Sequence, residues 1–250
     1  MPSTLLRLFC TTAITATALA APAFGFVVGT SDCGELGDGF GPYDFRTYDQ
    51  VYVHRVERAH FPTYVEFLER GKTNIYPAGD VDFVLRTFPT HHRALQSMSN
   101  AAFKFKSDPP PGSHYTVQCW FERALRFKRD DGTVYMLYGI FMLRKGAVES
   151  GVKLLEKSKE LAPADANIYY NLGLSYFSLK DYDKALENAH TAYRMGFPLP
   201  GLREKLIRAG KWKDAPATAA SKPADAAGET EPSTAPTPID APAAADDTKQ

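Results

Sequence analysis

Two stretches of this 250-residue chain, GTVYMLYG at 132–139 and ANIYYNLG at 166–173, share one pattern of large and small residues. In both, a tyrosine is followed three residues later by a large residue and then by a glycine, Gly139 or Gly173. The period of about 34 residues that separates the two glycines is typical of stacked helical hairpins, in which the small residue lets two helices approach closely. We therefore expect hairpins over residues 132–165 and 166–199; the alternative is that two amphipathic hairpins share a length by accident.

Turn residues support the same register. Lys145-Gly146 and Lys180-Asp181 occupy equivalent sites between the two helices of each hairpin, and Pro163 ends the first one. Over residues 132–199 the sequence resembles the tetratricopeptide repeat (TPR) family, which implies a helical solenoid that binds protein partners. The departures from the family pattern are Gly151 and Ser158, where alanine is expected, and Phe197, where proline arrives one residue late as Pro198.

Two repeats are too few to cover each other's apolar faces, so further helices should flank them. Residues 89–131 are interpreted as a degenerate third hairpin, with helices over 91–105 and 115–129 and an inserted loop at 108–112. The second of these helices has Phe121, Ala124 and Leu125 at the positions that face the hairpin core.

A capping helix is expected after the repeats. Within residues 200–213, a helix over 202–209 would turn Leu202, Leu206 and Ile207 inward and keep its charged residues in water.

The N-terminal extension, residues 24–88, shows no repeat. We expect a short helix over 62–70, a helix over 81–87 capped by Asp80, and a short strand at 51–53. Together with His91-His92-Arg93-Ala94-Leu95, passages such as Gly41-Pro42-Tyr43-Asp44 are similar to exported proteobacterial TPR proteins of unassigned role. The expected fold class is therefore mostly α, a short TPR-type solenoid with an N-terminal extension containing little or no β structure.

Both ends of the chain differ from a globular core. Residues 1–23 have one basic residue, a weakly apolar stretch and small-residue cleavage sites near Ala20 and Ala23, which predicts a secretory signal peptide. Residues 214–250 hold 12 Ala and 6 Pro and no aromatic residue, which predicts a disordered acidic tail. We expect the mature protein in the periplasm, with secretion as an alternative.

Overall charge and hydropathy exclude several protein classes. The 29 basic residues balance 29 acidic ones, which argues against nucleic acid as a partner. No run reaches the roughly 18 apolar residues of a membrane-spanning helix, so a channel or permease is excluded.

Cys33 and Cys119 are the two cysteines that remain if the signal peptide is removed. In an oxidising compartment we expect them to form one disulfide, which would attach the extension to the first hairpin. Two unpaired thiols are the alternative.

The candidate catalytic or metal-binding residues are three carboxylates, Glu57, Asp80 and Asp82, and six histidines: His54, His60, His91, His92, His114 and His190. None has the spacing of a metal site, and no phosphate loop or nucleophile motif is present, so we predict no metal, no cofactor and no catalytic residue. The alternative is an enzyme or ligand-binding protein with a pocket between the extension and the repeats, using His60 or His92 as general base.

The family resemblance also implies a partner-binding groove lined by the first helix of each repeat. The residues are Thr133, Met136, Ile140, Leu143 and Arg144, followed by Asn167, Tyr170, Leu174 and Phe177. This set is mostly apolar, which suits an apolar helix or an extended segment, with Met136, Tyr170 and Phe177 as anchors.

The expected function is thus a periplasmic adaptor that assists the assembly or stability of an envelope protein complex. Alternatives for the groove are that the extension or a neighbouring helix covers it, or that two copies dimerise through it.

Overall fold

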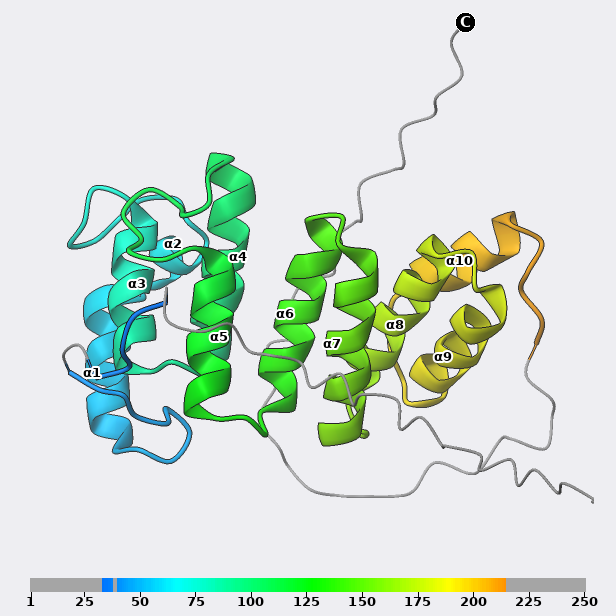
Figure 1. Cartoon of the computed structure of the whole chain (residues 1–250), viewed down its shortest axis with the longest axis horizontal. Helices are drawn as coiled ribbons and strands as arrows, with labels where there is room; N and C mark the ends of the chain where they lie inside the picture. The colour runs from blue at the N-terminus through cyan, green and yellow to red at the C-terminus, as the bar shows by residue number, and fades with distance from the viewer. Residues whose placement is uncertain (1–32, 38–39, 215–250) are drawn as a thin grey trace, which may run out of the picture.

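The computed structural model describes residues 33–37 and 40–214, which form ten α-helices and no strand. The helices are α1 (Gln50–His60), α2 (Thr63–Glu66), α3 (Pro77–Thr87), α4 (His92–Phe105), α5 (Val117–Phe127), α6 (Gly132–Arg144), α7 (Val148–Leu161), α8 (Ala166–Ser178), α9 (Tyr182–Arg194) and α10 (Gly201–Arg208). They succeed one another along the long axis of the molecule, from α1 at one end to α8–α10 at the other (Figure 1). The mostly α fold class is confirmed.

Helices α6–α7 and α8–α9 are the two expected hairpins. Asp131 and Asp165, one repeat period apart, cap α6 and α8, and each carboxylate accepts a hydrogen bond from a backbone N–H of the first turn. The turns inside the hairpins match as well, because Gly146 and Lys180 both have positive φ, at 83° and 60°. A left-handed residue after a helix lets the chain reverse while satisfying the last carbonyl groups.

Small residues hold α6 close to α7. A Cβ atom added at Gly139 would lie 3.1 Å from the Gly151 carbonyl oxygen, and one added at Gly151 would lie 3.0 Å from the Gly139 oxygen. The two backbones therefore approach at a point where neither helix has room for a side chain.

The first helices of successive hairpins form one continuous row. Helix α4 contacts α6, α6 contacts α8, and α8 contacts α10, while the second helices α5 and α7 contact the first helix of the following hairpin. This arrangement buries a single apolar core that runs through all the hairpins.

Helices α4 and α5 occupy the place of the degenerate hairpin. Phe121, Ala124 and Leu125 are all fully buried, as expected, and the Phe121 ring stacks on Tyr138 of α6 with centroids 4.9 Å apart. The inserted segment between the two helices is longer than in the other hairpins, since α4 ends at Phe105 and α5 begins at Val117.

The extension continues the same stacking, although its sequence was expected to show no repeat. Helix α3 contacts both α1 and α4. It ends four residues before the N-cap of α4, as α5 and α7 end four residues before the N-caps of α6 and α8. Pro89 and Pro163 both lie two residues after such a helix, and this shared spacing is the signal that could have revealed it.

Three expectations about the extension are wrong. Residues 51–53 belong to helix α1, because Asp49 caps its N-terminus and Val53 and Val56 face the core one turn apart. The helix expected over 62–70 is the single turn α2, which is followed by Leu68 with positive φ. Helix α3 starts at Pro77 instead of after Asp80, since proline suits a first helical turn.

The capping helix is present as α10. Leu202 and Leu206 are fully buried, but Ile207 is 52% exposed, so the inward orientation expected for Ile207 is wrong. Leu202 reaches α8, where a Cβ added at Gly173 would lie 2.3 Å from its Cδ2.

The predicted signal peptide and all of the predicted tail beyond Asp214 lie outside the described residues. Among the helices that the structure describes, none is long and apolar enough to cross a membrane.

Candidate functional site

All the predicted groove residues except Arg144 form pairs on α6 and α8 one repeat period apart, and the two members of each pair fall in the same burial range. Ile140 with Leu174, Leu143 with Phe177, and Thr133 with Asn167 are half-buried, whereas Met136 with Tyr170 is buried. The shared burial indicates that the two hairpins have the same packing.

Met136 and Tyr170, two of the three expected anchors, belong to the core. They are 2% and 6% exposed, and the Tyr170 ring stacks on Phe197 with centroids 4.2 Å apart. The chain that leads into α10 thus covers Tyr170, so a partner would contact Phe177 but not these two side chains.

Arg144 lies at the contact between α6 and α4. Its guanidinium donates a hydrogen bond of 2.8 Å to Asn100 Oδ1 and lies 3.8 Å from the centre of the Phe103 ring. Burial lowers the pKa of Arg144. The side chain connects two hairpins, and this position is half-buried.

Four half-buried apolar side chains remain from the predicted set: Ile140, Leu143, Leu174 and Phe177. We refer to them as the helix-A face. They come from two helices that contact each other, and they are packed on one side against the core. Such a surface can bury more apolar area when a partner binds.

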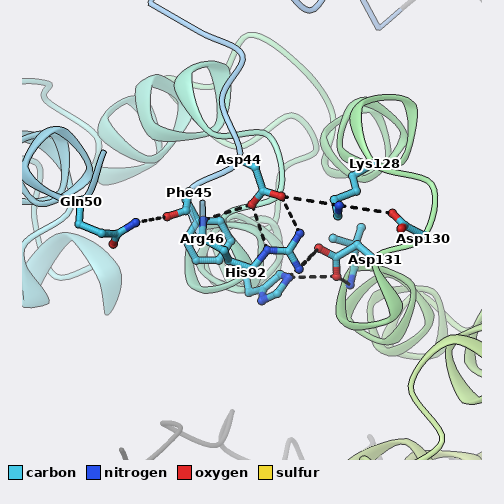
Figure 2. Close-up of polar contacts among 9 residues, drawn as sticks. Asp44, Phe45, Arg46, Gln50, His92, Lys128, Asp130 and Asp131 are labelled. Atoms are coloured by element: carbon cyan, nitrogen blue, oxygen red, sulfur yellow. Dashed lines mark hydrogen bonds and ion pairs between the residues drawn. The ribbon is translucent and has the colours of Figure 1, made fainter. Parts of the chain in front are cut away.

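A second cluster, the charged junction, joins the extension to α4 and α6 (Figure 2). Arg46 pairs with Asp44 at 3.0 Å and with Asp131 at 3.1 Å, and His92 Nε2 lies 3.0 Å from Asp131. Asp131 is 3% exposed and also caps α6. One buried carboxylate thus connects three segments of the chain.

The carboxylates of the charged junction are held in their ionised form. The hydrogen bond from Arg46 lowers the pKa of Asp44. Burial opposes ionisation of Asp131, but the hydrogen bond and charge of His92, with Arg46 nearby, outweigh it, and the pKa of Asp131 is lowered.

His91 is fully committed to structural contacts. Its Nδ1 accepts a hydrogen bond of 3.1 Å from the Ala94 N–H and so caps α4, which leaves the proton on Nε2. Nε2 donates to Glu57 Oε1 at 3.0 Å. The bond from His91 lowers the pKa of Glu57 to about 2, so His91 holds α1 to the start of α4.

Asp80 organises the loop before α3. Its fully buried carboxylate accepts hydrogen bonds from the backbone N–H groups of Lys72, Thr73 and Asn74, and from the Thr73 hydroxyl. His60 Nδ1 lies 3.2 Å from the same carboxylate. Burial opposes ionisation, but these donors outweigh it, and the pKa of Asp80 is lowered.

The carboxylate of Asp82 is also buried, and like that of Asp80 it holds a loop in place. Asp82, 1% exposed, pairs with Arg86 at 2.9 Å and accepts a hydrogen bond from the His114 N–H at 2.8 Å. It attaches the loop before α5 to α3.

His60 and His92, the two candidate general bases, are therefore both paired with carboxylates that fix loops or cap helices. Sequence reasoning named Asp80 but did not pair it with His60, 20 residues away, and it did not name Asp131, which lies 39 residues from His92. The one available signal was the position of Asp131, one repeat period before the equivalent cap at Asp165.

The predicted disulfide between Cys33 and Cys119 is present, with Cα atoms 5.1 Å apart. It attaches residues 33–37 to α5. The same segment is held by Arg123, whose Nη1 donates to the Cys33 and Glu35 carbonyl oxygens at 2.7 and 2.8 Å.

No family model matches this chain. It is 31% identical over 104 residues to TPR repeat-containing protein YpiA of Bacillus subtilis (strain 168), a match that covers 42% of this chain and 22% of that protein. It is 35% identical over 72 residues to BBSome complex member BBS4 of Bos taurus, covering 29% of this chain and 14% of that protein.

The chain thus spans less than a quarter of the length of either relative. The similarity and the packed hairpins agree on a TPR-like helical repeat, a structure that suits interaction with other proteins.

Proposed function

We propose that this protein is a periplasmic scaffold that binds a protein partner through the helix-A face and assists the assembly or stability of an envelope complex. Both relatives support the protein-binding part of this proposal, one by its name as a repeat protein and the other by its name as a member of a complex.

The observation that carries the proposal is the repeated half-burial of the helix-A face. Ile140 and Leu174 are large aliphatic residues at equivalent positions of adjacent helices, and neither is buried in the core. A folded chain gains nothing by leaving a continuous apolar surface partly in water unless that surface is used.

The chemistry of the helix-A face suits an apolar partner segment. Leu143 packs beside Gly151 on one side, and the Phe177 ring meets Tyr182 with centroids 5.5 Å apart. These side chains have fixed surroundings, so a partner helix or extended segment would bind without first ordering them.

The proposed location rests on two features. Residues 1–23 have the composition of a secretory signal peptide. The disulfide between Cys33 and Cys119 is of a kind that persists in oxidising compartments such as the periplasm.

The test is affinity purification with crosslinking from the native envelope, using wild type and the double variant Ile140→Glu, Leu174→Glu. The matched control is Val152→Glu, Leu186→Glu, which places the same charges at half-buried aliphatic positions, also one repeat period apart, on α7 and α9. Circular dichroism checks that both variants are folded.

We expect a specific partner that is retained by wild type and by the control and lost from the helix-A variant. The proposal fails if the folded helix-A variant retains the same partners as the control, because binding would then use another surface.

A further inference from the structure

Three potential metal ligands meet where residues 33–37 are attached to α5. Among the described residues, Cys33, Cys119 and Glu122 are the group whose ligand atoms all lie within 4.8 Å of one another. Cys119 and Glu122 are three residues apart on α5, so they project from the same face of that helix.

Among the residues that the structure describes, none provides a hydrogen-bond donor for one oxygen of Glu122. It is 7% exposed, and Oε1 accepts a hydrogen bond of 2.9 Å from Gln118. Oε2 lies 3.3 Å from the Cys33 sulfur, which carries no hydrogen in a disulfide. Within residues 33–37 and 40–214, no N–H or O–H group donates to Oε2, which is costly for a buried carboxylate oxygen.

Two arginines hold Cys33 in place independently of the disulfide. Arg123 donates to the Cys33 carbonyl oxygen at 2.7 Å, and Arg126 Nη2 donates to the Gly34 carbonyl oxygen at 2.7 Å. After the S–S bond breaks, these hydrogen bonds would keep the Cys33 thiol beside Cys119.

We propose that reduction of this disulfide opens a binding site for a zinc-type divalent cation, with the thiolates of Cys33 and Cys119 and the carboxylate of Glu122 as ligands. Tetrahedral ligands about 2.3 Å from zinc lie about 3.8 Å apart. The three ligand atoms already lie within 4.8 Å of one another, so a small separation of the two sulfurs reaches this spacing. Water would fill the fourth position. Thiolate ligands favour zinc over magnesium or calcium.

The electron and proton balance of the opening step requires a dithiol reductant. The reductant transfers two electrons and two protons, the S–S bond breaks to give two S–H groups, and the reductant becomes a disulfide. Binding of the cation then displaces the two thiol protons into solvent. Arg123 and Arg126 offset part of the negative charge that the three ligands bring.

The experiment titrates Co²⁺ into the reduced, desalted full chain under anaerobic conditions, in a Cys10→Ser background so that no third thiol competes. Thiolate-to-cobalt charge-transfer absorbance reports binding, and displacement by Zn²⁺ reports zinc affinity. We expect one equivalent in reduced protein and none in oxidised protein. Cys119→Ser should abolish the absorbance, and Glu122→Gln should weaken binding by roughly tenfold or more.

Glu160→Gln, an exposed carboxylate on α7, is the matched control and should bind as wild type does. Circular dichroism establishes that the reduced protein is folded. The proposal is overturned if folded, reduced protein shows no saturable charge-transfer band, or if Glu122→Gln and Glu160→Gln bind with equal affinity.

Discussion

Asp131 combines three structural roles in one carboxylate. It caps α6, pairs with Arg46 of the extension and accepts from His92, all while 3% exposed. Its neighbour Asp130 has a side chain that is 73% exposed and a single ion pair at 3.7 Å with Lys128. The two adjacent aspartates therefore differ sharply in what they contribute to folding.

Replacing Asp131 with Asn should lower the free energy of unfolding by about 2 kcal/mol, because it removes the charge that Arg46 and His92 need while keeping the side-chain size. Urea denaturation measures the loss. Asp130→Asn is the control and should change stability by less than about 0.5 kcal/mol, since exposed pairs contribute little. Equal effects of the two substitutions would contradict the structural role of the charged junction.

Acid should destabilise the fold in a defined range of pH. The pKa of Glu57 is about 2 in the folded protein, below its usual value near 4.3, so its ionised form stabilises the fold above the unfolded value. That stability, about 3 kcal/mol, is lost as the pH falls from about 4.5 towards 2. Glu57→Gln should flatten the pH dependence of unfolding in this range; an unchanged slope would contradict the His91–Glu57 contact.

At the scale of elements, the hairpin α6–α7 depends on the space left by glycine. Gly151 departs from the alanine of the TPR pattern, and the structure gives a reason. A Cβ atom there would lie 2.7 Å from Leu143 Cγ and 3.0 Å from the Gly139 carbonyl oxygen. The Leu143 side chain occupies the space that an alanine methyl group at position 151 would need.

Gly151→Ala should therefore destabilise the protein, although alanine is the better helix former by about 1 kcal/mol. We expect a net loss of about 1–2 kcal/mol from overpacking, seen as a lower Tm. Ser150→Ala, one residue earlier in α7, controls for helix propensity and should not lower Tm. A higher Tm for Gly151→Ala would show that the two helices can move apart freely.

At the scale of the whole molecule, the hairpins form a row, and the disulfide attaches residues 33–37 to α5 of that row. The helices pack mainly against helices close to them along the row, from α1 to α10 (Figure 1). The disulfide closes a loop of 86 residues. A covalent bond persists on unfolding and restricts the unfolded chain, whereas noncovalent contacts between hairpins are lost.

Cys33→Ser, Cys119→Ser should cost about 2–4 kcal/mol in unfolding free energy through the lost loop closure. The helical circular dichroism signal should remain, because Arg123 and Arg126 still bind the backbone of the segment. Urea denaturation of this variant against Cys10→Ser measures the cost. Unfolding of the double variant in plain buffer would mean that the disulfide alone maintains the fold.

The sequence by itself determined the repeated hairpins, their register and the capping helix. Helix packing within a hairpin depends on the sizes of residues close in sequence, such as Gly139 and Gly151, so it can be read from local spacing. The cysteine pair was also predictable, because only two cysteines follow the predicted signal peptide.

Only the tertiary structure decided which predicted groove residues stay accessible and what the histidines contact. Met136 and Tyr170 match the groove pattern as well as Ile140 and Leu174 do, but neighbouring packing buries them. Likewise the partner of His92 lies 39 residues away. Such contacts depend on how separate hairpins stack, and no local periodicity encodes that geometry.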